Sequence, residues 1–203
     1  MKTELLNIIN NADEPVYELD SYIAALEPEC KKDIAWKELK QIALSGKLQQ
    51  RFIALTVISE NKPIYLEQLT SELIGEKHFA KNELILKPIV NICSTLMKEE
   101  HISFMQDVLD YAAKNDKEFL YELTLRNLLA TSSWENVIEE LIKVVSTSDE
   151  LTIVDLLAFF INEQGIQGYQ SLVKHFPSVE QRKVNELDKK IKKRLKDGYQ
   201  NLK

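Results

Sequence analysis

Apolar residues recur at intervals of three and four along nearly the whole chain, and only an α-helix gathers that spacing on one face. The run Val137, Ile138, Leu141, Ile142, Val144 and Val145 shows the pattern. Five Gly and five Pro among 203 residues leave few breaks between such runs. A buried strand could compete only over residues 152–161, where the acidic residue and the length favour a helix. The chain is therefore predicted to be all-α.

Turn and capping residues divide this pattern into segments of about three turns. Breaks fall at Gly46, Pro63, Gly75, Gly165 and Pro177. Ser133 and Ser148, each followed by acidic residues, are predicted to begin helices. We expect helices near residues 2–11, 15–27, 31–45, 47–60, 63–75, 82–97, 99–114, 117–132, 134–146, 149–163, 167–176 and 178–201.

Three of these segments repeat one another. When residues 49–55, 85–91 and 124–130 are aligned, the basic residues Arg51, Lys87 and Arg126 coincide, with periods of 36 and 39 residues. Such a period is typical of solenoids built from helix pairs, in which each pair buries its apolar face only against its neighbours. A helical bundle with helices of similar length is the alternative.

The pattern Leu39-x-x-Ile42-Ala43-x-Ser45-Gly46, followed by Arg51-x-x-Ala54-Leu55, resembles the turn and second helix of a HEAT unit. The resemblance to the HEAT and armadillo superfamily covers about residues 31–176, although Lys87-Pro88 departs from the pattern. It implies a right-handed α-solenoid of about five antiparallel helix pairs within a single domain, 1–203. Residues 1–30 would be N-terminal cap helices and residues 177–203 a basic C-terminal capping helix.

Residues suited to catalysis or metal binding are isolated from one another. His78, His101 and His175 belong to no metal-binding motif, and we expect all three on helix ends or solvated faces. Cys30 and Cys93 lack a CxxC pattern, which favours inert thiols in a reducing compartment, with a disulfide as the alternative. The sequence predicts no catalytic residue, cofactor or metal, and hence no enzyme.

Neither a signal peptide nor an apolar stretch long enough to cross a membrane is evident, so a cytoplasmic location is expected. Early-helix aromatic residues, among them Trp134 and Phe119, are expected mainly in the core. An exposed one would be a binding hot spot.

Charge is distributed unevenly. Residues 182–203 hold nine basic and three acidic residues, so this segment is +6 and residues 1–181 are −12. Between Glu99 and Asp155, thirteen acids face four bases. A charge bias in several consecutive units creates a field that steers an oppositely charged partner.

We therefore expect a non-enzymatic module that binds or neutralises a basic protein, for example a bacterial immunity protein against a cationic toxin. Metal binding or catalysis by the paired acids is the less favoured interpretation. The expected partner-binding residues are acids of the central helices, with one tryptophan as an aromatic anchor: Asp107, Asp110, Glu118, Glu122, Glu135, Glu139 and Trp134.

Two alternatives remain. One group of alkylpurine DNA glycosylases is built from HEAT-like repeats, but its concave surface is basic, whereas this body is acidic. A regulatory scaffold could instead contact nucleic acid through its tail. In that tail Val184, Leu187, Ile191 and Leu195 share one face, so it is an amphipathic helix that either caps the solenoid or binds nucleic acid or an anionic membrane.

Overall fold

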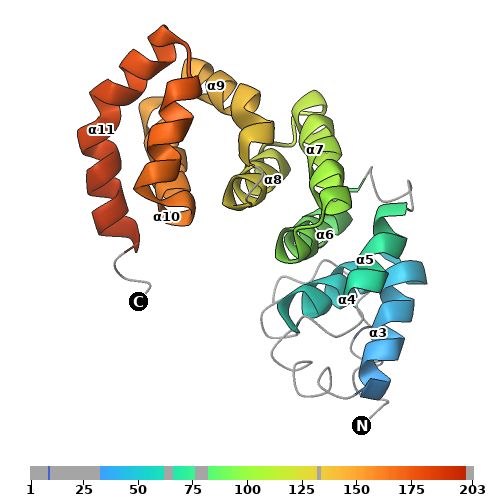
Figure 1. Cartoon of the computed structure of the whole chain (residues 1–203). Helices are drawn as coiled ribbons and strands as arrows, with labels where there is room; N and C mark the ends of the chain where they lie inside the picture. The colour runs from blue at the N-terminus through green and yellow to red at the C-terminus, as the bar shows by residue number, and fades with distance from the viewer. Residues whose placement is uncertain (1–8, 10–32, 62–65, 76–81, 132–133, 200–203) are drawn as a thin grey trace. The chain divides into compact units, whose positions relative to one another are not determined.

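The structure of the chain is a computed structural model, and it describes residue 9 and residues 33–61, 66–75, 82–131 and 134–199 (Figure 1). The described elements are all helical, without a strand among them, which confirms the all-α prediction. The helices expected over residues 15–27, and nearly all of 2–11, lie outside the described residues. The chain divides into two compact units, residues 1–121 and 122–203.

Unit 1 contains five complete helices and the start of a sixth among its described residues: α3 (Asp33–Ser45), α4 (Leu48–Asn61), α5 (Leu66–Gly75), α6 (Glu83–Leu96), α7 (Glu99–Lys114) and the first turn of α8 (Glu118–Ala130). Within it α4 packs on α3 and α6, and α6 also packs on α5 and α7. Fully buried side chains such as Leu39, Ile53, Leu69 and Ile89 form its core.

Unit 2 holds the rest of α8, a 3₁₀ turn (Trp134–Val137), α9 (Ile138–Thr147), α10 (Glu150–His175) and α11 (Ser178–Tyr199). α10 and α11 lie side by side, and α11 also packs on α9 (Figure 1). Phe160 is fully buried at the centre, with the Trp134 ring edge-on at 5.3 Å between centroids. The predicted helix 134–146 thus begins as a 3₁₀ turn.

The helix boundaries follow local capping chemistry. The Asn82 side chain accepts the Leu84 amide at the start of α6. The side chain of Asp149 accepts the Leu151 and Thr152 amides at the start of α10, so the cap falls one residue after the predicted Ser148. These hydrogen bonds, to the backbone and hydroxyl of Thr152 above all, lower the pKa of the Asp149 carboxyl. Ser133, the other predicted cap, lies outside the described residues.

Gly165 interrupts α10 and divides it at the place where the sequence predicts a break between helices 149–163 and 167–176. Its φ of 71° and ψ of 175° lie in a region that is open essentially to glycine alone. Next to this kink, the Gln164 side-chain amide donates to the carbonyl oxygens of Leu129 and Thr131, at 2.7 and 2.9 Å. These bonds satisfy two carbonyls at the C-terminal end of α8.

Candidate functional site

One face of α7 is apolar and buried, and the opposite face is acidic and exposed. Met105, Val108 and Leu109 pack inward, whereas Asp107 and Asp110 are exposed one turn apart. This opposition follows from the helical period, which places residues three and four apart on one face. The structure therefore exposes two of the predicted partner-binding residues side by side in unit 1.

The turn from α7 to α8 adds an acid and an aromatic ring. The amide of Lys117 donates to the Ala112 carbonyl at 3.0 Å, and α8 begins at the next residue, Glu118, which is exposed. Phe119 follows with 61% of its surface exposed, so the expectation that it lies in the core is wrong. The buried face of α8 includes Leu120 and Leu128. Phe119 precedes Leu120 by one residue and therefore points away from that face. This spacing is the sequence signal that could have predicted its exposure.

The exposed ring of Phe119 already has one cation in contact with it. Lys87 Nζ, from α6, lies 4.2 Å from the ring centroid, a distance typical of a cation–π contact. Lys87 also pairs with Glu83 at 3.1 Å, and Lys117 lies 3.9 Å from the same carboxylate. We call Asp107, Asp110, Glu118 and Phe119 the α7–α8 edge.

Each lysine of this region lies close to a carboxylate, but not every carboxylate lies close to a lysine. Lys114 lies 4.0 Å from Asp110, and the Glu83 carboxylate forms ion pairs with both Lys87 and Lys117. Asp107 and Glu118 form no ion pair with the described residues. Because exposed ion pairs are weak and leave the local charge balance unchanged, the α7–α8 edge keeps a net negative charge.

The remaining predicted acids belong to unit 2. Glu122 is exposed and pairs with Arg126 at 2.8 Å, while the Arg126 guanidinium lies 5.2 Å from the Phe159 ring centroid. Glu135 and Glu139 are exposed and four residues apart. They lie on the 3₁₀ turn and in the first turn of α9, respectively.

Trp134 is a core residue of unit 2. It is 7% exposed and packs edge-on against Phe160, and its ring centroid lies 6.4 Å from that of His175. This is the packing role that the sequence favours for early-helix aromatic residues. A ring this buried offers little surface to a partner, so the exposed aromatic residue beside the predicted acids is Phe119.

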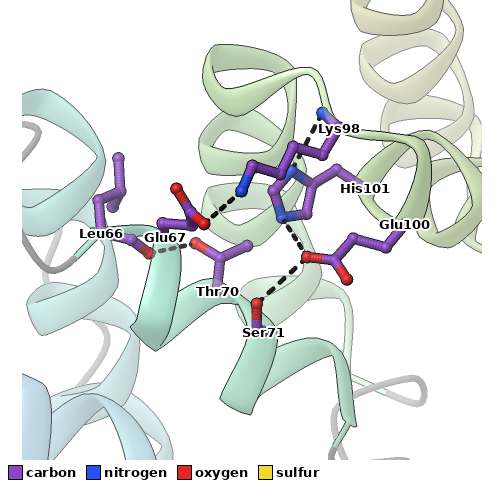
Figure 2. A network of polar contacts seen from close by, with 7 residues as sticks. All are labelled: Leu66, Glu67, Thr70, Ser71, Lys98, Glu100 and His101. Carbon is purple, nitrogen blue, oxygen red and sulfur yellow. Dashed lines mark hydrogen bonds and ion pairs between the residues drawn. The ribbon is translucent and has the colours of Figure 1, made fainter.

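The second departure from expectation is His101, which is completely buried although a solvated position was predicted. Its Nδ1 accepts the backbone amide of Lys98 at 3.3 Å. Its Nε2 makes no hydrogen bond, with the Glu100 carboxylate 3.5 Å away. Glu100 in turn accepts the Ser71 hydroxyl of α5 at 3.2 Å (Figure 2).

The same network joins α5 and α7 through a second contact, because the Lys98 ammonium pairs with Glu67 (Figure 2). Hydrogen bonding to Lys98, and its charge, lower the pKa of the Glu67 carboxyl. Burial lowers the pKa of His101 and outweighs the opposing effect of Glu100. Burial thus favours the neutral imidazole, which lies beside the two contacts that join α5 and α7, Lys98–Glu67 and Ser71–Glu100.

Cys93 and His175 are the titratable candidates that remain among the described residues. Cys93 is a buried free thiol, and its pKa is raised to about 12, chiefly by burial, so it is a poor nucleophile. His175 lies at the C-terminal end of α10, as predicted. His78 and Cys30 lie outside the described residues.

In the described part of the chain, no group of three or more His, Cys, Asp or Glu side chains is arranged to hold a metal ion. Nor is any described helix both long and apolar enough to cross a membrane. Comparison with known protein families, curated proteins and solved structures finds no match to this chain. Function is therefore inferred from the exposed surfaces of the two units.

Proposed function

We propose that this chain is a non-enzymatic protein-binding module, an acidic α-solenoid that binds a basic protein through the α7–α8 edge of unit 1. The observation behind this proposal is the combination of exposed acids with an exposed aromatic ring. Asp107 and Glu118 have no cation among the described residues, and Phe119 is 61% exposed. An immunity protein that masks a cationic toxin would be one protein of this class.

This combination suits a basic partner for two reasons. Aromatic side chains are enriched among the residues that dominate protein interfaces, because they bury a large area with little loss of conformational entropy. The surrounding carboxylates attract a cationic surface and accelerate its association. The Lys87 ammonium on the Phe119 ring gives an intramolecular example of the contact that a partner's Lys or Arg would make.

The solenoid part of the proposal is supported by the connections between helices. Residues 46–47 join α3 to α4, residues 97–98 join α6 to α7, and residues 176–177 join α10 to α11. Connections this short produce antiparallel helix pairs, which are the building blocks of HEAT-like repeats.

Charge reversal at the α7–α8 edge tests the function. In Asp107→Lys/Glu118→Lys, both substituted positions are exposed, so helicity and thermal stability should stay close to those of the parent chain. The proteins that the immobilised parent chain and the immobilised variant each retain from a lysate of the native host would be compared by quantitative mass spectrometry. We expect a basic protein that the parent retains, in a salt-sensitive manner, to be lost from this variant.

A matched control separates the site from overall charge. Glu60→Lys/Glu163→Lys makes the same change in net charge at exposed positions on α4 and α10. It should retain the partner as the parent chain does. Equal retention by both double variants, or equal loss from both, would contradict the assignment of binding to the α7–α8 edge.

A further inference from the structure

The apolar face of α11 is buried from Val184 to Ile191. Val184 and Ile191 are completely buried and Leu187 is 6% exposed, where α11 lies against α10 and α9. A helix that binds a membrane surface must insert its apolar face between the lipids. Because that face of α11 is occupied by protein, the interpretation of the tail as a membrane-binding helix is disfavoured.

The outward face of α11 is a row of cations. Arg182, Lys189, Lys193 and Lys196 are all exposed, and their spacings of seven, four and three residues place them in one stripe. At about 1.5 Å per residue, the row extends over roughly 21 Å. None of the four forms an ion pair with a described residue, and we call this row the α11 basic stripe.

Other charged residues of α11 form ion pairs away from the stripe. The remaining acids are too few to neutralise it. Lys190 pairs with Glu150 and Arg194 pairs with Asp155, both acids of α10. These intramolecular ion pairs join α11 to α10. Asp188 pairs with Lys192 at 2.7 Å. Two further acids are exposed on or beside the stripe, Glu186 and Asp197.

The side chains between the cations indicate what kind of partner fits. From Arg182 to Lys196 every exposed position of α11 is polar or charged. A protein partner would need an apolar or aromatic centre to its interface, and the stripe offers none. The phosphate backbone of a nucleic acid needs only cations in a row, and binding of this kind does not read sequence.

We propose that the α11 basic stripe binds the phosphate backbone of nucleic acid without sequence preference. This surface belongs to unit 2, whereas the α7–α8 edge belongs to unit 1, and the proposal does not depend on the function proposed for that edge. Four cations imply that affinity falls with salt at a logarithmic slope of about −3 for single strands and about −3.6 for duplexes. Between about 50 and 200 mM salt, binding should weaken by roughly 50- to 150-fold.

Fluorescence anisotropy with the full-length chain tests the proposal. The probes are a labelled oligothymidine and a labelled mixed-sequence duplex, titrated across that range of salt. The variant Lys189→Glu/Lys193→Glu/Lys196→Glu should bind both probes at least tenfold more weakly. Its circular dichroism and melting temperature, compared with those of the parent, establish that the fold is retained.

The control Lys37→Glu/Lys114→Glu/Lys143→Glu has the same net charge, with the changes at exposed positions outside α11. Parent-like binding by this control would support the stripe as the binding site. Equal weakening of both variants, or none in either, would overturn it. Binding of polyglutamate or of phosphatidylserine vesicles as tightly as the oligonucleotide would also overturn the assignment to nucleic acid.

Discussion

The kink in α10 leads to a test in which the backbone alone is changed. At Gly165 a Cβ atom would meet nothing within 4 Å, yet the residue has a φ of 71°. Substitution by alanine therefore creates no clash and costs only backbone strain, about 1–3 kcal/mol. Gly75 is a natural control, since a Cβ there also meets open space and its backbone is not in the left-handed region.

Both substitutions reduce the conformational freedom of the unfolded chain by a similar amount, so this effect cancels when the two are compared. Gly165→Ala should lower the free energy of unfolding of unit 2 relative to Gly75→Ala by about 1–3 kcal/mol. Gly75→Ala, at the end of α5, should be neutral or stabilising by up to about 1 kcal/mol. In melting temperature the cost at Gly165 amounts to about 4–8 °C for each kcal/mol in a domain of this size.

Urea unfolding followed by Trp134 fluorescence measures the effect on unit 2, with Trp36→Phe in every variant so that Trp134 is the only tryptophan. Circular dichroism measures the Gly75→Ala control. A Gly165→Ala chain as stable as its parent would show that α10 does not require the glycine conformation. In that case the kink would not be a fixed feature of the fold.

Three further predictions concern buried contacts. Gln164→Glu replaces the donor to Leu129 and Thr131 by a carboxylate and should cost about 1–3 kcal/mol in urea unfolding, whereas Gln167→Glu at an exposed position should not. Phe160→Ala should cost about 3–5 kcal/mol by the same assay, and Phe119→Ala less than about 0.5 kcal/mol; equal costs would contradict the difference in burial. Because the folded pKa of His101 is below its ordinary 6.5, stability should be full above pH 6.5 and fall as the pH drops toward the folded value; an NMR titration midpoint at or above 6.5 would contradict this.

Much of the fold could be predicted from local pattern. The three-and-four spacing of apolar residues depends only on the geometry of a helix, so helix positions and most boundaries follow from the sequence. Gly165 marks the kink because only glycine adopts its backbone conformation without strain. The exposure of Asp107 and Asp110 follows in the same way, since they lie opposite Met105 and Leu109 on α7. The repeat architecture and the binding function stay predictions.

Tertiary structure determined whether the residues at the margins of each apolar face are buried or exposed. His101 and Phe119 both follow acidic residues at the start of a helix, yet one is fully buried and the other 61% exposed. The difference comes from neighbours distant in sequence. α5 contributes Ser71 and Glu67 to the network around His101, whereas Phe119 is contacted by the ammonium of Lys87 and stays largely exposed. A helical pattern specifies which side of a helix is apolar, but the packing of other helices determines how far burial extends around it.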